Sequence, residues 1–328
     1  MTGHRKPEPI EVVRALADRA VAEGHVGVVA GIVSGDRVAI AGAGRIGADG
    51  LVPDRRTIFR IASVSKPITA TALALAVVRG ELGLGDTLHD QLPAWRLPAD
   101  PFGRITLEQL ATHRSGMPHG LDGTLTSIDD YVDALTRVRP ATGPGVEYAY
   151  SNLGAQLIGM VLTRGAAEPF DAMLRETLAG IAGAGDVVDR LDPDQQARLA
   201  LGHDLTGTLC ETPDHPLGVA SGGLHATAES LLALVRAHWS AVDDQLAEAL
   251  RLTTTPRADA FGGNRIGLLW HLGPVPDGDG LEAIWHNGSL PGYRSFLGFR
   301  PDERLGAVVL SNTAKSVDGY GAELLAAA

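Results

Sequence analysis

Two residues near position 65 have side chains that can carry out acyl-group chemistry together. They are Ser63 and Lys66, in the segment "IASVSKPITATALALAVVRG" of residues 61–80. At positions i and i+3 of a helix, their side chains share one face, with Cβ atoms about 5–6 Å apart. A serine hydroxyl is a poor nucleophile without a base, and a lysine in an apolar setting has a lowered pKa. The pair therefore predicts a serine nucleophile that a neutral amine activates.

The residues next to this pair indicate where the helix begins. Pro67 suits a first helical turn, because its missing N–H needs no partner there. Ser63 would then lie at the positive end of the helix dipole, where backbone N–H groups favour an oxyanion. Ser65 is a rival hydroxyl, but it is adjacent to Lys66 and points to another face.

A second candidate segment, "PGVEYAYSNLGAQLIG", contains Tyr150 and Asn152 just before an apolar helix. A phenol whose pKa is lowered by a nearby ammonium can relay a proton. The Asn152 amide can orient Lys66 and bind an acyl side chain. Taken alone, the pattern is better explained by a buried tyrosine and a helix-capping asparagine.

The third candidate segment is "WHNGSLPGYRSFLGFRPDERLGAVVLSN", which places His286, Gly288 and Ser289 on an expected strand. Glycine in a strand permits close approach of substrate to the backbone. A β-bulge with an exposed His286 is the alternative interpretation of this segment.

The elements that must bring these segments together follow from periodicity. A helix is expected over residues 8–23, then a hairpin through "SGDR" with Gly35 at the positive φ of a tight turn. Helices and loops are expected from Pro67 to about residue 245, followed by antiparallel strands and a final helix at 317–328. This order predicts an α+β fold in one catalytic domain, 1–328, with an α/β part of residues 1–75 and 246–328 and an inserted helical part of residues 76–245.

Composition excludes several classes of protein. The chain has 328 residues, 45% of them hydrophobic, and a formal charge of -11, so we expect a globular protein without a nucleic-acid partner. Cys210 is the single cysteine, so no intramolecular disulfide can form. Neither a secretory leader nor an apolar run of about 18 residues is recognisable, which predicts a cytoplasmic location and no membrane partner.

Metal and cofactor chemistry is not expected either. His113 and His119 match no usual metal-ligand spacing, and H-E-x-x-H is absent, so both are expected to be loop residues with satisfied hydrogen bonds. A Ser-His-Asp hydrolase is disfavoured because the chain lacks G-x-S-x-G. We therefore expect no cofactor.

In order along the chain, Ser63-x-x-Lys66, Tyr150-x-Asn152 and His286-x-Gly288 resemble the motifs of the serine β-lactamase and penicillin-binding-protein superfamily. The similarity is to the branch of class C β-lactamases, D-Ala-D-Ala carboxypeptidases and aminopeptidases, and family VIII esterases. It extends over about residues 8 to 315, including "LATHRSGMPHG" and "ASGGLHATAESLLAL". The resemblance implies an antiparallel sheet covered by helices, with a mostly helical subdomain.

The resemblance also implies a role for each residue. Ser63 would be the acylated nucleophile, Lys66 its base, and Tyr150 the proton shuttle to the leaving group. Asn152 would contact the substrate and order the lysine. The backbone N–H groups of Ser63 and Ser289 would form the oxyanion hole.

One departure from the family pattern bears on the substrate. The β-lactamases and peptidoglycan peptidases usually have a lysine where this chain has His286. A histidine of ordinary pKa is mostly neutral at pH 7, so recognition of a substrate carboxylate should be weaker. Arg294 is a possible replacement cation, although a solvated strand residue is the simpler interpretation.

These observations predict a serine acyl-enzyme hydrolase of esterase or amidase type that acts on a small ester or amide. An acyltransferase or peptide cyclase that passes the acyl group to an amine or alcohol is the alternative. A true β-lactamase or D-Ala-D-Ala carboxypeptidase fits less well, and a catalytically silent binding protein is opposed by the intact Ser63, Lys66 and Tyr150.

Overall fold

The fold is known from a computed structural model that describes residues 7–48, 50–123, 125, 127–165, 170–213 and 216–327. Its main sheet has eight strands in the order β2-β1-β10-β9-β8-β7-β6-β5, and every neighbouring pair is antiparallel. The strands are β1 (Gly27–Ser34), β2 (Arg37–Gly44), β5 (Ala258–Asp259), β6 (Arg265–Ile266), β7 (His271–Pro274), β8 (Glu282–Leu290), β9 (Tyr293–Arg300) and β10 (Leu305–Ser311). A separate pair joins β3 (Ile58–Arg60) to β4 (His225–Thr227).

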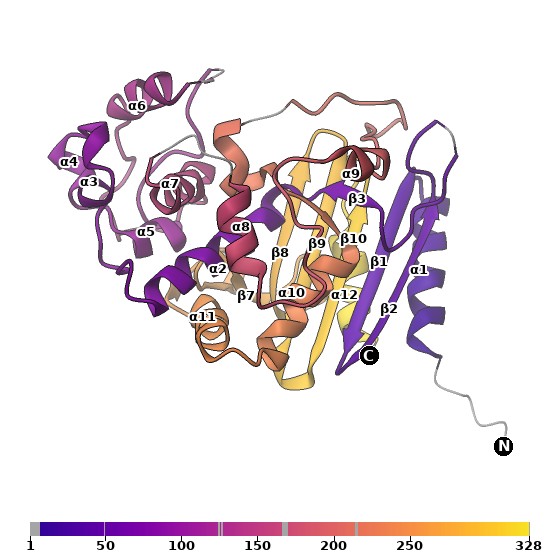
Figure 1. Cartoon of the computed structure of the whole chain (residues 1–328). Helices are drawn as coiled ribbons and strands as arrows, with labels where there is room; N and C mark the ends of the chain where they lie inside the picture. Colours follow the sequence, from indigo (N-terminus) through magenta and orange to yellow (C-terminus); the bar gives the residue numbers. More distant parts are fainter. Residues whose placement is uncertain are drawn as a thin grey trace.

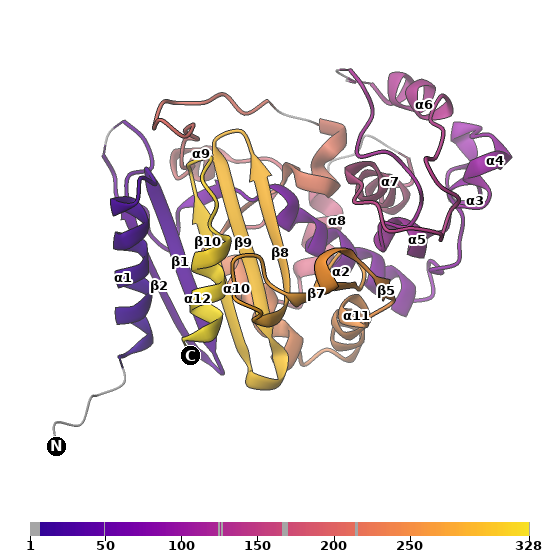
Figure 2. The same cartoon turned by 180° about the vertical axis from the view of Figure 1, so that it is seen from behind.

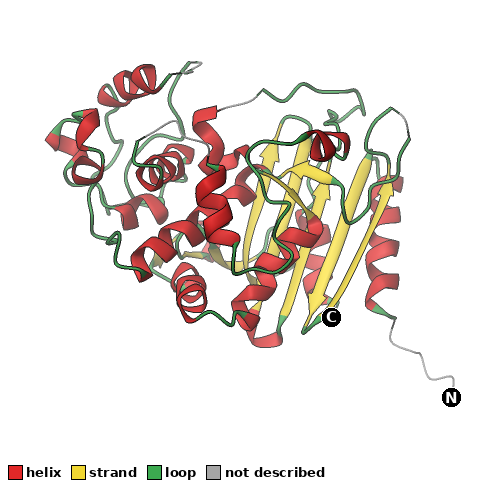
Figure 3. Ribbon diagram, in the orientation of Figure 1, coloured by secondary structure: helices red, strands yellow, loops and turns green. Residues whose placement is uncertain are grey.

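Helices make up most of the remaining regular structure. They are α1 (Pro9–Ala22), α2 (Ser65–Val78), α3 (Leu88–Gln91), α4 (Ala99–Phe102), α5 (Leu107–Ala111), α6 (Ile128–Thr136), α7 (Asn152–Leu162), α8 (Asp171–Leu178), α9 (Pro193–Ala197), α10 (Ala228–Ser240), α11 (Asp244–Thr254) and α12 (Asp318–Ala326). Figure 3 shows the strands gathered on one side of the molecule and most helices on the other. Among the described residues, no helix is both long enough and apolar enough to span a membrane.

Helices cover both faces of the main sheet. Helices α1 and α12 pack on one face, against β1, β2, β9 and β10, and α10 packs on the opposite face (Figures 1 and 2). Each face has its own apolar core, because alternate residues of a strand point to opposite sides. Strand β10 is buried along its whole length, as expected for a central strand covered on both sides.

Helix α2 lies at the junction between the sheet and the helical part of the molecule. Residues 65–76 of this helix are all buried, and it packs against α7 and α11. Its many alanines suit this position, because small side chains let neighbouring elements approach from every side. The first turn of α2, which carries Lys66, is therefore enclosed by protein.

The predicted fold class is confirmed, and most expected elements form close to their predicted bounds. The hairpin turns through Gly35, whose φ is +59°, and the "RPDER" segment forms a short 3₁₀ turn between β9 and β10. The division at residues 75 and 245 stays a prediction, but α10 falls inside the expected helical part and packs on the sheet. Its apolar face is buried against β1 and β10, so periodicity alone could not assign it to either part.

Candidate active site

Ser63 and Lys66 meet at the start of α2. Ser63 lies in a 3₁₀ turn, Ala62–Val64, that leads directly into the helix. The Lys66 Nζ atom is 3.0 Å from the Ser63 Oγ atom. Ser65 points elsewhere: its hydroxyl donates to the Ala62 carbonyl at 2.7 Å. The expected i, i+3 pair is therefore formed, and the rival hydroxyl is bonded to the backbone.

The surroundings of Lys66 favour its neutral form. The side chain is fully buried, and this burial lowers its pKa well below the usual 10.5. Besides Ser63, the Nζ atom contacts the Asn152 Oδ1 atom at 2.7 Å and the Ser221 carbonyl oxygen at 2.6 Å. A neutral amine has two N–H groups, and these two oxygens can accept both. Its lone pair is then directed at the Ser63 hydroxyl.

Tyr150 completes the group from the other side of the serine. Its hydroxyl donates to the Ser63 Oγ atom at 3.0 Å. The expectation that a nearby ammonium lowers its pKa is wrong: burial raises the pKa of Tyr150 to about 12. The hydrogen bond to Ser63 acts in the opposite direction, but it is the smaller effect. The resting phenol is a hydrogen-bond donor.

Asn152 begins α7, but it does not cap the helix. The cap is Ser151, whose hydroxyl accepts from the Gly154 N–H at 3.0 Å. This frees the Asn152 amide for Lys66, and the Asn152 Nδ2 atom lies 3.0 Å from the His119 Nε2 atom. Both ends of the amide are therefore engaged.

His286 lies on β8 with its ring buried at 1% exposure, so an exposed His286 is excluded. Its Nδ1 atom is 2.7 Å from the Asn287 carbonyl oxygen, which fixes the proton on Nδ1. Burial lowers the pKa of His286 well below its usual value, with His271 and Lys66 contributing in the same direction. The ring is therefore neutral, as expected for the departure from the family pattern.

Gly288 and Ser289 follow on the same strand, where the pairing with β9 runs without a bulge. A Cβ atom at Gly288 would lie 2.6 Å from the Ile61 carbonyl oxygen and 2.9 Å from the Ala62 Cβ atom. The glycine thus permits close approach of the turn that carries Ser63. Ser289 lines the same cavity as Ser63.

Two buried histidines beside Tyr150 were not predicted as site residues. The rings of His113 and Tyr150 lie 4.5 Å apart, and His271 lies 5.0 Å from His286. Burial is the main reason that the pKa of each lies below 6.5, at about 4 for His271. The His113 Nδ1 atom accepts the Ser151 N–H, but the buried Nε2 atom has no hydrogen-bond partner among the described residues, so the expectation of satisfied hydrogen bonds is wrong for this ring. Nothing in their spacing signals the site, because four separate elements bring these rings together.

The Arg294 side chain is bonded to the backbone at the end of β8. Its guanidinium donates to the carbonyl oxygens of Leu290 and Tyr293, in the hairpin that joins β8 to β9. Burial lowers its pKa, and Asp318 acts in the opposite direction. The side chain is half-buried, so it is not a fully solvated strand residue, and its role as a replacement cation stays a prediction.

A cavity of about 340 Å³ opens beside the serine. It is lined by Arg60, Ala62, Ser63, Gly120, Leu121, Gly123, Leu125, Tyr131, Asn152, Gln156, Pro213, Leu217, Gly218, Ser221, Gly222, Gly223, Ser289 and Leu290. Candidate nucleophile, candidate oxyanion donors and room for a substrate therefore occur at one place. Among the described residues, no group of three His, Cys, Asp or Glu side chains can hold a metal ion.

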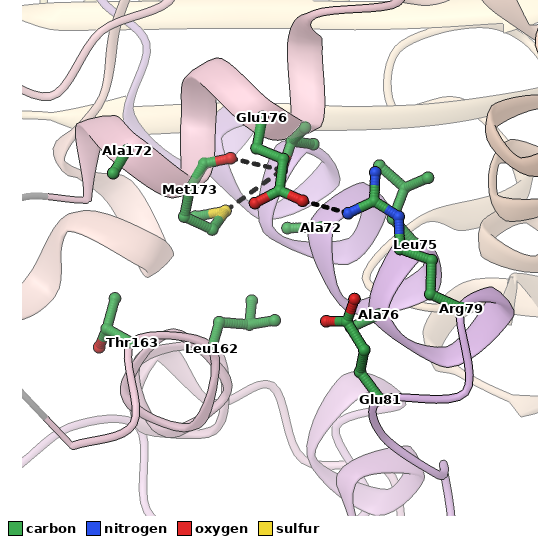
Figure 4. Close-up of a pocket in the computed structure, with 11 residues that line it drawn as sticks. Ala72, Leu75, Ala76, Arg79, Glu81, Leu162, Thr163, Ala172, Met173 and Glu176 are labelled. Carbon is green, nitrogen blue, oxygen red and sulfur yellow. Dashed lines mark hydrogen bonds and ion pairs between the residues drawn. The ribbon is translucent and has the colours of Figure 1, made fainter.

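A second cavity, of about 280 Å³, lies between α2, α7 and α8 (Figure 4). Figure 4 shows the ion pair between Arg79 and Glu176 at its edge. The hydroxyls of Thr163 and Thr177 in its wall donate to carbonyl oxygens of their own helices. No activated nucleophile occurs among these lining residues, so the first cavity is the candidate for chemistry.

Comparison with known proteins identifies the family of the chain. The model of the beta-lactamase family matches residues 13–328. The chain belongs to the beta-lactamase family. Among curated relatives, a beta-lactamase of Pseudomonas fluorescens is 25% identical over 78% of this chain and 79% of its own length. The D-alanyl-D-alanine-carboxypeptidase/endopeptidase AmpH of Escherichia coli (strain K12) is 24% identical over 79% of this chain and 71% of its own length.

Solved structures of this family have the same fold. A class C beta-lactamase superposes with a TM-score of 0.88, covering 99% of this chain and 98% of that chain at 20% identity. A beta-lactamase/D-alanine carboxypeptidase from Pseudomonas syringae gives a TM-score of 0.87 at 21% identity, covering 97% and 98%. The expected relationship to the serine beta-lactamase and penicillin-binding-protein superfamily is confirmed, and the chain is a serine hydrolase of this family.

Proposed function

We propose that this family member is an esterase or amidase that forms an acyl-enzyme on Ser63 from a small ester or amide. One observation carries the proposal: the Ser63 Oγ atom lies 3.0 Å from both the Lys66 Nζ atom and the Tyr150 hydroxyl. An amine that can accept a proton and a phenol that can donate one therefore contact the same oxygen. This is the arrangement that a nucleophile and its proton shuttle require.

Acylation begins with loss of the Ser63 proton. The hydroxyl proton passes to the lone pair of Lys66 as the Ser63 oxygen attacks the substrate carbonyl carbon. The resulting ammonium lies 4.9 Å from the centre of the Tyr150 ring, where the π-face stabilises it. Asn152 and the Ser221 carbonyl keep the nitrogen in place during the transfer.

Collapse of the tetrahedral intermediate requires a proton on the leaving group. Tyr150 donates its phenolic proton to the departing oxygen or nitrogen and recovers one from the Lys66 ammonium. In deacylation the direction reverses: Tyr150 and Lys66 together remove a proton from the incoming nucleophile, and the Ser63 oxygen is reprotonated. Backbone N–H groups of Ser63 and Ser289 would stabilise the oxyanion in both steps.

The neutral His286 favours substrates without a carboxylate beside the scissile bond. In the described residues around Tyr150, four histidines lie close to its ring, and burial keeps His113, His271 and His286 uncharged. An anion buried against these neutral rings would be costly. We therefore place neutral esters and amides ahead of β-lactams and D-Ala-D-Ala peptides.

Intact-mass measurement of the protein after exposure to p-nitrophenyl acetate and to penicillin tests the proposal. We expect an acetyl adduct on wild-type protein, none on Ser63→Ala, and a smaller yield of the penicilloyl adduct. The proposal would be overturned if no adduct formed on the wild-type protein and if Ser63→Ala released p-nitrophenol as fast as the wild type.

Transfer of the acyl group to an amine or alcohol is the second candidate. The pKa of about 12 at Tyr150 favours an amine acceptor in particular, because a phenol that resists ionisation activates water and alcohols poorly. An amine acceptor is intrinsically more nucleophilic and needs less activation. Partitioning of the acetyl-enzyme between water and added hydroxylamine or short alcohols would separate hydrolysis from transfer.

A further inference from the structure

One wall of the active-site cavity is apolar. Leu121, Leu125 and Leu217, named here the leucine wall, line the cavity and pack against the main core. All three are half-buried, and the buried ring of Tyr131 lies beside them in the cavity lining. Apolar surface of this kind, left accessible inside a cavity, favours an apolar ligand group.

The polar atoms near the leucine wall are bonded to one another. The Tyr131 hydroxyl donates to the Gln156 Oε1 atom at 3.3 Å, and the Gln156 Nε2 atom donates to the Ser221 Oγ atom at 3.3 Å. The Ser221 hydroxyl donates onward to the Gly218 carbonyl at 2.9 Å. An apolar group placed here therefore leaves none of these bonds broken.

The Asn152 amide is held in the same way. Lys66 binds its oxygen at 2.7 Å, and His119 lies 3.0 Å from its nitrogen. The amide plane cannot rotate toward an acyl side chain without breaking one of these bonds. The bond to His119 uses one of the two N–H donors of the Asn152 amide, which leaves a single N–H for an acyl side chain.

The described lining of the cavity carries little charge. Among the described lining residues, Arg60 is the single cation, and no carboxylate occurs. Arg60 is on β3, two residues before the turn of Ser63, whereas the leucine wall comes from the loop after α5 and the segment before α10. At about 340 Å³ the cavity lies near the lower end of the range of roughly 300–1,000 Å³ for ligand pockets.

We infer that the acyl group transferred to Ser63 is short, uncharged and apolar, and that it packs against the leucine wall and Tyr131. This inference rests on the proposed acyl-enzyme function and adds the class of acyl group to it. Recognition comes from apolar burial and not from a hydrogen bond to an amide in the acyl chain.

A series of p-nitrophenyl esters tests the inference. The acyl groups are acetyl, butanoyl, pentanoyl, hexanoyl, phenylacetyl, succinyl and N-acetylglycyl, the last matching pentanoyl in length while containing an amide. We expect kcat/KM to rise by about fourfold for each added methylene until the cavity is filled, because each buried methylene contributes a similar free energy. Pentanoyl should exceed both N-acetylglycyl and succinyl esters.

Two variants and one control show where the preference originates. Leu217→Gln should flatten the chain-length dependence, whereas Leu205→Gln, the same change at a surface leucine with 71% exposure, should leave it intact. His119→Ala should raise the N-acetylglycyl to pentanoyl ratio, because it releases the Asn152 nitrogen. The ratio of kcat/KM for two esters, measured in the same variant, does not change when a substitution lowers the activity toward both esters equally. Thermal melting checks that each variant is folded.

The outcomes separate the inference from the function on which it rests. Adducts on Ser63 with no dependence on chain length, or a preference for succinyl or N-acetylglycyl esters, overturn the inference and leave the acyl-enzyme in place. Equal flattening in Leu217→Gln and Leu205→Gln also overturns it. No adduct with any of the esters overturns the proposed function and the inference together.

Discussion

At the scale of single residues, the neutral state of Lys66 is the feature on which the chemistry depends. Its amine meets three oxygen atoms, and only the deprotonated form can donate to two of them and accept from the third. Burial supplies this state by lowering the pKa of the amine. The nitrogen is therefore both oriented and basic before substrate arrives.

Replacing Lys66 by arginine should abolish acylation while keeping a cation in the chain. A guanidinium stays protonated at any working pH, so it cannot accept the Ser63 proton. We expect kcat/KM for a p-nitrophenyl ester to fall by roughly 10⁴-fold or more, the scale seen when one member of a catalytic unit is removed. Loss of less than tenfold would contradict the role of Lys66 as base.

The pH dependence of kcat/KM should have one acid limb. Because the pKa of Lys66 in the folded protein lies well below 10.5, its amine is neutral over a range where a free lysine is charged. The rate should be low where Lys66 is protonated, rise as pH increases through its folded pKa, and then stay level. Because the pKa of Tyr150 is about 12, the phenol stays protonated in mildly basic buffers, and kcat/KM should not fall there. Steady-state rates across acid to mildly alkaline buffers check this, and a rate that first rises near the pKa of free lysine would contradict it.

Tyr150→Phe removes the phenolic proton and leaves the ring that faces Lys66. We expect acylation to slow and deacylation to slow further, with a loss of about 10²- to 10⁴-fold from removing general acid-base catalysis. Rapid-mixing measurement of the p-nitrophenol burst and of adduct lifetime separates the two steps. Unchanged burst and lifetime would move the proton transfers to another group.

At the scale of elements, the site depends on how closely β8 approaches the turn before α2. Ser295 on β9 donates to the Ile61 carbonyl at 2.7 Å, and Gly288 leaves room for that contact. A Cβ atom at Gly288 would lie 2.3 Å from the Ser295 Oγ atom and 2.6 Å from the Ile61 oxygen. The glycine is thus a packing requirement that sets the position of Ser63 relative to Ser289.

Gly288→Ala should therefore separate the strand from the nucleophile turn. We expect kcat/KM to drop by about 10²-fold, because misplacement of reacting groups by about 1 Å has this effect. Gly185→Ala is the matched control, since a Cβ atom there meets no atom within 4 Å. Both variants are measured with the same ester and by thermal melting, and equal activity in the two would show that the close approach does not matter.

At the scale of the whole molecule, the sheet is a rigid platform that is stabilised from both faces. Helices α1 and α12 lie side by side on the face away from the site, where Arg19 and Glu323 form an ion pair. The exposed pair adds little stability, and the packing of α12 on β9 contributes more. This layer packs on β9 and β10, next to the strand β8 that carries Gly288 and Ser289, and it contributes no reacting group.

Gly321→Ala in α12 should lower stability and not chemistry. A Cβ atom there would lie 2.1 Å from the Phe296 Cδ1 atom, so the helix must move from the sheet. Overpacking of this kind costs about 1–3 kcal/mol of unfolding free energy. Gly319→Ala, two residues earlier in the same helix, is the control. Its added Cβ atom would lie at an ordinary contact distance of 3.5 Å from the Asp277 Cβ atom. Denaturant unfolding should distinguish the two variants, and equal midpoints would contradict the packing argument.

The sequence by itself determined the elements of the sheet and the three motifs, because hydrophobic periodicity and the spacing of Ser63 and Lys66 act locally. It could not give the protonation state of Tyr150, which depends on burial by residues from distant segments. The same is true of His113, His119 and His271, whose rings reach the site through tertiary packing. Local pattern specifies which side chains are available, whereas desolvation and proximity exist only once the chain has folded.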